Sequence, residues 1–275
     1  MFMNTKYILQ LLAITALFLS MLACNLVNLA KPNATQAPET TIKEATSTPE
    51  ISSEPTATTE APTQPADACD NPYLPVITGA TWNYKLSGPV PDTYTHTIMT
   101  VGSDGFTEQD VFGTSLTRVG QWKCENGDLI ALMPPNGSSG TIQSNNVQAN
   151  FETKDLSGTT LPGKIKSGDT WSQSLTLEGT QSIAGTELPA SNKVTSNCKA
   201  ISVESVTVEA GTFDAMRVEC QNIMVVTVKL GGTETSNTII LTNVTWYVEN
   251  VGMVKNSTTG MGLDSTTELV SYSIP

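Results

Sequence analysis

The sequence MRVECQNIMVVTVKL, residues 216–230, alternates between apolar and polar side chains along most of its length. Its even positions are Met, Val, Cys, Asn, Met, Val, Val and Leu, and its odd positions include Arg, Glu, Gln, Thr and Lys. Ile223 and Val225 break the pattern at the odd positions. A period of two predicts a β-strand with one face in a core and the other largely in water. Because this strand is longer than most, we expect a strongly twisted sheet that wraps over its own core.

The residues before this strand predict its hairpin partner. The sequence Val208-Glu209-Ala210-Gly211-Thr212 supplies a turn, in which Gly211 suits the left-handed position of a short loop. On the incoming side the parity of the apolar residues switches, which predicts a bulge near Glu204-Ser205.

Similar short runs fill the rest of residues 68–275, where β-branched and aromatic segments alternate with Gly, Asn, Asp and Ser turns. Helical periodicity is hard to find there, so we expect an all-β domain built as a single antiparallel, strongly curved sheet or as a barrel-like or sandwich-like domain. The expected strands are 81–87, 94–101, 106–112, 116–124, 129–133, 147–152, 170–177, 194–203, 206–208, 213–230, 238–248, 253–256 and 268–274.

A short pattern occurs twice in this domain. Gly79-Ala80-Thr81-Trp82 and Gly168-Asp169-Thr170-Trp171 share the pattern G-x-T-W, and each is expected to open a strand. A duplication would divide the domain into two related halves. The alternative is that a turn followed by a buried tryptophan is a common way to begin a core strand.

An apolar leader precedes the domain. Residues 1–23 carry one early positive charge, Lys6, followed by an apolar run of about 16 residues, which is short for a membrane-spanning helix. This layout predicts a signal peptide. The sequence Met21-Leu22-Ala23-Cys24 resembles the lipobox of bacterial lipoproteins. The resemblance implies that Cys24 is the lipidated mature N-terminus, whereas ordinary signal cleavage nearby is the alternative.

Residues 24–67 are predicted to form a disordered stalk behind the lipidated cysteine. From residue 31 onward this segment consists mostly of Thr, Pro, Ala, Ser and Glu, and Ile42 and Ile51 are its only large aliphatic residues. Such a segment cannot bury enough apolar surface to offset the entropy lost on ordering. Its composition also resembles O-glycosylated stalks. We therefore expect an extracytoplasmic lipoprotein at the cell surface or outer envelope, with the membrane as its partner through the lipid on Cys24.

The remaining cysteines are even in number, as expected for an exported chain with two disulfides. Cys69, Cys124, Cys198 and Cys220 allow three pairings. The hairpin near residue 210 favours Cys198 with Cys220, although register places them one or two residues from directly opposite. Cys69 would then pair with Cys124. A zinc site is disfavoured because no Cys-x-x-Cys spacing occurs and the chain has one histidine, so we predict no metal and no cofactor.

Residues suited to catalysis are sparse, and we predict no catalytic residue. The single histidine, His96, alternates within an expected strand and is interpreted as a surface residue. No G-x-S-x-G motif or phosphate-binding glycine loop is present. Asp104, Glu108 and Asp110 form the densest acidic group and could hold calcium weakly, but solvated hairpin acids are far commoner. A glycosidase-like pair of carboxylates stays open because such pairs form only in the fold.

The net charge of −12 argues against partners that carry dense negative charge. Nucleic acid binding requires a basic patch, and the 14 Lys and Arg residues are scattered along the chain. The charge also provides no long-range attraction to anionic lipid, and its main effect is on solubility.

Three stretches resemble landmarks of uncharacterised exported bacterial β-rich proteins known as TapB-like. These stretches are residues 79–84, 206–218 and 246–255. The resemblance implies an antiparallel, curved or barrel-like sheet and no activity. In this interpretation Trp82 and Trp246 are core anchors.

Three functions remain open from the sequence. The first is a non-catalytic lipoprotein whose β domain binds an envelope protein or glycan or has a structural role. The second is a carrier of an apolar ligand, with Met216, Met224 and Val226 on the inner face of the sheet. The third is a hydrolase, which would require two carboxylates converging in a cleft about 5–10 Å apart.

Overall fold

The computed structural model describes residues 68–113, 116–132, 141–143, 147–183, 186–230, 233–262 and 264–275. The described residues form thirteen β-strands and no helix. Accordingly, none of them belongs to a helix with the length and apolar character needed to cross a membrane. The predictions for residues 1–67, including Cys24, concern a part of the chain outside the described residues.

The strands have the following bounds: β1 Thr81–Ser87, β2 Asp92–Val101, β3 Gly105–Phe112, β4 Thr117–Glu125, β5 Asp128–Ala131, β6 Thr141–Gln143, β7 Val147–Gly158, β8 Thr170–Ile183, β9 Thr186–Val208, β10 Gly211–Leu230, β11 Thr233–Val248, β12 Gly252–Thr259 and β13 Ser265–Ser273.

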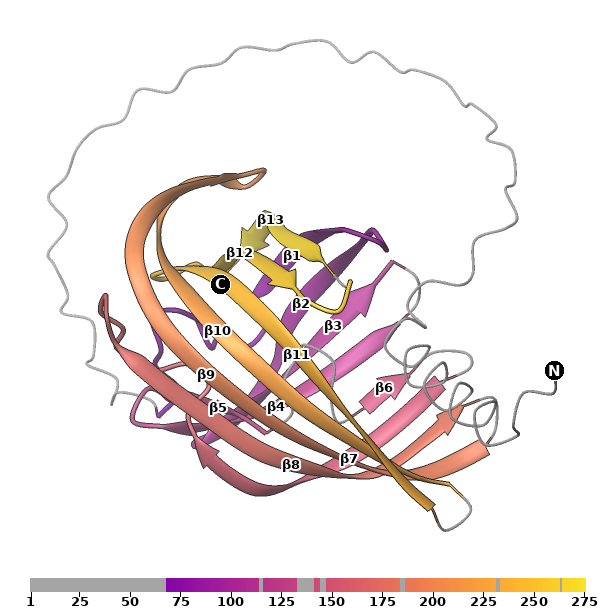
Figure 1. Cartoon of the computed structure of the whole chain (residues 1–275). Helices are drawn as coiled ribbons and strands as arrows, with labels where there is room; N and C mark the ends of the chain where they lie inside the picture. Colours follow the sequence, from indigo (N-terminus) through magenta and orange to yellow (C-terminus); the bar gives the residue numbers. More distant parts are fainter. Residues whose placement is uncertain are drawn as a thin grey trace, which may run out of the picture. The chain divides into compact units, whose positions relative to one another are not determined.

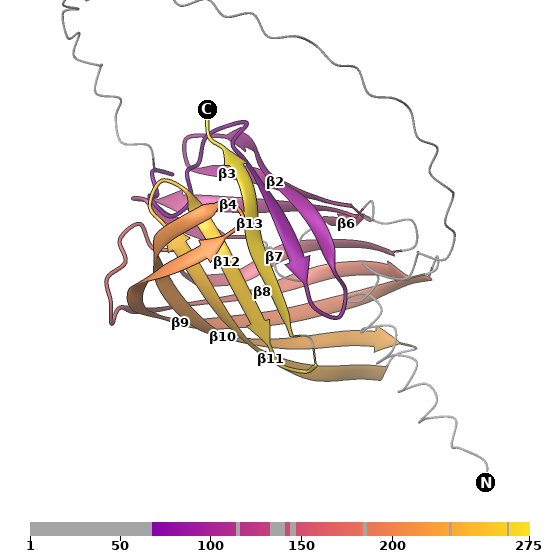
Figure 2. The same cartoon turned by 90° about the horizontal axis from the view of Figure 1, so that it is seen from above.

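All thirteen strands belong to one antiparallel sheet, with the order β3-β2-β1-β13-β12-β11-β10-β9-β8-β7-β6-β4-β5. Strand β3 also pairs with β4, so the sheet curves round until its two ends meet. Figures 1 and 2 show the resulting barrel-like shape. The predicted all-β fold with a single, strongly curved antiparallel sheet is therefore confirmed.

Residues 216–230 lie in β10, which has 20 residues and pairs with β9 on one side and β11 on the other. Strand β9 is continuous over 23 residues, whereas the sequence predicted two shorter strands there. The bulge also lies elsewhere than predicted, because Met216 pairs with Val203 and Val218 pairs with Ala200. The apolar residue Val203 made the parity switch near Glu204-Ser205, but Val203 is 60% exposed and does not belong to the core.

The largest hydrophobic cluster fills the interior between the two walls of the sheet. Its fully buried members include Trp82, whose indole N–H donates to the carbonyl of Val251 at 2.6 Å. Trp246 packs against this cluster from a partly exposed position and donates its N–H to Glu204 at 2.6 Å. Of the two expected anchors, Trp82 alone is a fully buried core residue.

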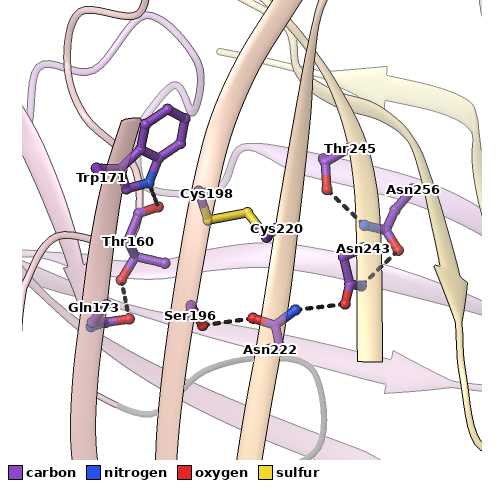
Figure 3. Close-up of a disulfide and its surroundings, with 10 residues drawn as sticks. All are labelled: Thr160, Trp171, Gln173, Ser196, Cys198, Cys220, Asn222, Asn243, Thr245 and Asn256. Atoms are coloured by element: carbon purple, nitrogen blue, oxygen red, sulfur yellow. Dashed lines mark hydrogen bonds between the residues drawn. A yellow bond between two sulfur atoms is a disulfide. The ribbon is translucent and has the colours of Figure 1, made fainter. Parts of the chain in front are cut away.

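Two disulfides are present. Cys69 is bonded to Cys124, and Cys198 is bonded to Cys220. Cys198 lies directly opposite Cys220 in the β9–β10 ladder, because the bulge falls between the turn and this pair and corrects the register. Figure 3 shows the second bridge between two neighbouring strands.

The two G-x-T-W sequences adopt the same local structure. Gly79 and Gly168 both have positive φ, at 85° and 94°. Their N–H groups donate at 2.9 Å to the carbonyls of Ile98 and Ala200, which lie in the strands that pair with β1 and β8. The next residue in each copy donates to the carbonyl three residues earlier and accepts a bond from the same partner strand.

The same correspondence between the two copies extends to the residues that lie opposite their tryptophans on the neighbouring strands. Trp82 lies opposite His96, and Trp171 lies opposite Cys198. His96 pairs in register with Asp110, whereas Cys198 pairs with Cys220. An ionic pair in one copy therefore occupies the place of a disulfide in the other.

Candidate functional site

Four charged side chains meet inside the sheet, on the strands β2, β3 and β4. His96 Nδ1 lies 2.8 Å from Asp110 Oδ1, and His96 Nε2 lies 3.6 Å from Glu108 Oε2. Arg118 donates from Nε to Asp110 Oδ2 at 2.9 Å. Asp110 lies between His96 and Arg118 in the ladder, so the three side chains share one face of the sheet. We call these four residues the ionic cluster.

The ionic cluster is almost completely shielded from solvent. The side chains of Glu108 and Asp110 are each 3% exposed, and those of His96 and Arg118 are 13% and 15% exposed. Above His96 lies the ring of Trp82, at 5.3 Å between centroids. Gly120 provides the space for Glu108, since a Cβ atom at Gly120 would lie 2.5 Å from Glu108 Oε1.

Burial and charge act in opposite directions on the pKa values of the ionic cluster. Burial raises the pKa of Glu108 by more than the charge of His96 lowers it. Burial alone would also raise the pKa of Asp110, but Arg118 and His96 together lower it to about 2. For His96, burial lowers the pKa, whereas the combined effect of Glu108 and Asp110 is larger and raises it above its ordinary value.

Two interpretations from the sequence are wrong at this site. His96 is not a surface residue, because its side chain points into the interior and contacts two carboxylates. The three acids are not all solvated hairpin residues either, since the side chains of Glu108 and Asp110 are 3% exposed and only Asp104 of the three is exposed, in the turn before β3. Within the described ranges, no group of three or more His, Cys, Asp and Glu residues could hold a metal ion.

The chemistry available to the ionic cluster is limited by its contacts. The polar partners of His96 among the described residues are the carboxylates of Glu108 and Asp110, and no described hydroxyl or thiol forms a hydrogen bond with its ring. Asp110 already accepts bonds from both His96 and Arg118. These contacts resemble a structural ion-pair network rather than an acid and base awaiting a substrate.

A second polar group lies on the inner face of β9–β12. Ser196 donates to Asn222 at 2.6 Å, Asn222 donates to Asn243 at 2.7 Å, and Asn243 donates to Thr258 at 2.8 Å. Asn256 continues the chain of bonds by donating to Thr245 at 2.7 Å. We call these residues the amide ladder, and Figure 3 shows all of them except Thr258 beside the disulfide. The alternation in the sequence did not predict this ladder, although Asn222 is a polar residue among the apolar even positions of β10.

Beyond the amide ladder the inner face becomes apolar again. Across four neighbouring strands, β8 to β11, the register aligns Leu175, Val194, Met224 and Ile239 in one row. Met224 and Val226 belong to a small cluster with Ile239 that is separate from the main core. Met216 belongs to the main core instead, so the structure brings together two of the three residues expected to line a ligand site.

A comparison of the sequence with known families bears on the chain as a whole. The profile of the DUF3108-like family matches residues 115–273, which is more than half of the chain. The chain belongs to the DUF3108-like family. The part of this DUF3108-like protein that matches the family profile spans β4 to β13, and it includes the amide ladder and Arg118. His96, Glu108 and Asp110 lie outside the matched residues.

Solved structures similar to this DUF3108-like protein come from three bacteria. A protein of Bacteroides fragilis, described as exported with a YmcC-like fold, has 13% identity and a TM-score of 0.48, and the match covers 74% of this chain and 99% of that one. A protein of Parabacteroides distasonis, described as a lipoprotein, has 16% identity and a TM-score of 0.49 over the same shares. The hypothetical lipoprotein YmcC of Escherichia coli has 11% identity and a TM-score of 0.35, covering 72% and 86%. No curated protein is significantly similar to the sequence.

Proposed function

We propose that this DUF3108-like protein is a membrane-anchored extracytoplasmic lipoprotein whose β domain acts by binding, without catalysis. The leader and the lipobox-like sequence that ends at Cys24 support the anchor. The observation that supports a non-catalytic role is the saturation of the ionic cluster, in which His96 and Arg118 are both committed to Asp110.

A hydrolase is the weaker proposal. Glu108 and Asp110 are the carboxylates that come together, but they lie two residues apart on β3 and both contact His96. With side chains that are 3% exposed, neither has room for a water molecule and a scissile bond in the described structure. A glycosidase needs its two carboxyl groups on opposite sides of the substrate.

The finer parts of the proposal rest on the sequence. Anchoring by two or three acyl chains would hold the protein firmly at the membrane, and the stalk of residues 24–67 would separate the domain from it. The leader supports a position at the cell surface or outer envelope. A TapB-like relationship is proposed from residues 79–84, 206–218 and 246–255.

Mass spectrometry of the native protein purified from membranes tests the anchor. We expect an N-terminal peptide that begins at Cys24 and carries the mass of a diacylglyceryl group, with or without a further acyl chain. A Cys24→Ala variant should lack this mass and remain unprocessed at this position. A mature N-terminus without acyl mass in the unsubstituted protein would contradict the proposal.

A further inference from the structure

Strand β11 has a long edge that no other described strand covers. Its residues 242–248 pair with β12, whereas its residues 233–241 pair with β10 alone among the described strands. Gly260 lies beside the last two of these residues, since a Cβ atom there would be 2.7 Å from the carbonyl oxygen of Ile240. Residues 233–239 are therefore the part of this edge that is free for another strand. We call them the open edge.

The contact at Gly260 also shows which backbone groups the open edge presents. The carbonyl of Ile240 points toward the side of β12, away from β10. In an antiparallel strand the N–H and C=O groups of one residue point to the same side, and the side alternates from one residue to the next. Glu234, Ser236 and Thr238 therefore direct their N–H and C=O groups outward, while the odd-numbered residues bond to β10.

The open edge lacks the features that usually keep a sheet edge from pairing. It has no proline, no register shift against β10 and one charged residue, Glu234, whose carboxylate lies 3.9 Å from Lys229 Nζ. Strand β7 differs, because its residues 151–158 have β8 as their only partner among the described strands and the ladder shifts register within them. That stretch also carries three charged residues, which are Glu152, Lys154 and Asp155. Pairing is thus opposed at β7 and unopposed at β11.

The inner face of the open edge indicates what kind of strand fits it. Thr235 and Asn237 are half-buried there, and neither side chain forms a hydrogen bond with a described residue. A threonine and an asparagine bond to each other farther along the same face, where Asn256 lies directly opposite Thr245 and donates to it at 2.7 Å. The open edge contains both members of such a pair, so a strand of the same sequence complements it.

We propose that the open edge pairs in antiparallel fashion with the open edge of a second copy of this chain, about a twofold axis. Full overlap of the seven residues places Ser236 on the axis and Glu234 opposite the partner's Thr238. The outward backbone groups then form about six hydrogen bonds between the copies. In the same register Asn237 of each copy lies opposite the partner's Thr235.

Charge and symmetry both favour a second copy as the partner. The two Glu234 side chains are four residues apart along the seam, or roughly 14 Å, which exceeds the screening length of about 8 Å at physiological salt. Pairing uses the open edge of each copy, so assembly closes at two chains. The lipid proposed on Cys24 would raise the effective concentration of the copies on one membrane, but the pairing itself does not require it.

Oxidative crosslinking of the full-length protein in mild detergent tests the register. Ser236→Cys places two thiols across the axis, where opposed Cα atoms are about 5.5 Å apart and a disulfide can form. Thr238→Cys is the matched control, because it is an exposed position on the same face of the same strand, but its two copies would lie roughly 14 Å apart. We expect the Ser236→Cys dimer to form at least tenfold faster than the Thr238→Cys dimer.

A proline substitution tests the pairing without a crosslink. Thr238→Pro removes an N–H that points away from β10, so the bonds between β10 and β11 stay in place. Native mass spectrometry should show a dimer for the unsubstituted protein and for Thr238→Val, which keeps the N–H, and a monomer for Thr238→Pro. The circular dichroism spectrum of Thr238→Pro should be that of the folded protein.

Three results would overturn the pairing: equal crosslinking at the two cysteine positions, no crosslink at either, or a folded Thr238→Pro variant that is still a dimer. Peptide mass mapping of the same samples identifies the crosslinked cysteine and reports any acyl mass on Cys24. Failure of the proposed anchor is therefore recorded separately from failure of the pairing.

Discussion

Asp110 is the residue on which the ionic cluster depends, because it accepts bonds from both His96 and Arg118. Replacing Asp110 by Asn keeps the shape of the side chain and removes its negative charge. The buried cationic groups of His96 and Arg118 are then poorly compensated. Removing one partner of a buried ion pair typically costs about 3–5 kcal/mol. We expect Asp110→Asn to lower the free energy of unfolding by about that amount in urea titrations.

The matched control for Asp110 is Asp104, an exposed acid in the turn before β3. Asp104→Asn should change the free energy of unfolding by less than about 0.5 kcal/mol, as is usual for a surface site. If the two variants had the same stability, the ionic cluster would contribute nothing to the fold.

His96 gives the stability of the protein a predictable dependence on pH. Its pKa is raised in the folded state, so its contribution is fully present below the unfolded value of about 6.5 and is lost as the pH rises through the folded pKa. Urea titrations between pH 5.5 and pH 9 should show stability falling with rising pH, and His96→Gln should remove part of this slope. An identical slope in the variant would assign the loss to other groups.

Asp110 acts at the opposite end of the pH range. Its folded pKa of about 2 lies below its ordinary value, so its contribution is present above about pH 4 and is lost as the pH falls toward 2. The titrations for His96 are therefore performed above this window, where Asp110 stays ionised in both folded and unfolded states.

At the scale of the elements, the β9–β10 hairpin combines the longest strands with the Cys198–Cys220 bridge. The two cysteines are separated by 22 residues, and closing a loop of that length stabilises by roughly 3 kcal/mol in the chain-entropy description. A Cys198→Ala/Cys220→Ala variant should lose about this amount in denaturant titrations. Retained stability would mean that the long ladder alone holds the hairpin.

Most strands could be predicted from the sequence, because alternation and turn residues are local signals. Strand β1 begins and ends where the pattern places it, and the turn at Asn126-Gly127 has the positive φ values that the sequence favours. Strand β6 was missed because three residues carry no period. The first part of β9 was missed because Pro189 and its polar neighbours weaken the pattern, and only pairing with β8 and β10 makes it a strand.

The candidate sites were harder to predict than the strands. His96 lies between two threonines, so its own strand does not show which face is buried. Its partners come from other strands, and only the register of β2, β3 and β4 brings the charges together.

At the scale of the whole molecule, the pairing of β3 with β4 joins one end of the curved sheet to the other. Cys69 and Cys124 reinforce this closure by linking the segment before β1 to β4. The interior therefore has two walls, one with the ionic cluster and one with the amide ladder and the apolar row of Leu175, Val194, Met224 and Ile239.

Closure of the sheet between β3 and β4 removes one edge at which a second copy of the domain could pair. A row of free backbone N–H and C=O groups at the rim of an open sheet invites strands from other chains and leads to aggregation. Strand β11 is different, because its residues 242–248 pair with β12 whereas its residues 233–241 pair only with β10 among the described strands. If the lipid proposed on Cys24 holds many copies on one membrane, contact between their backbones is therefore expected along that part of β11 and not at the junction of β3 and β4.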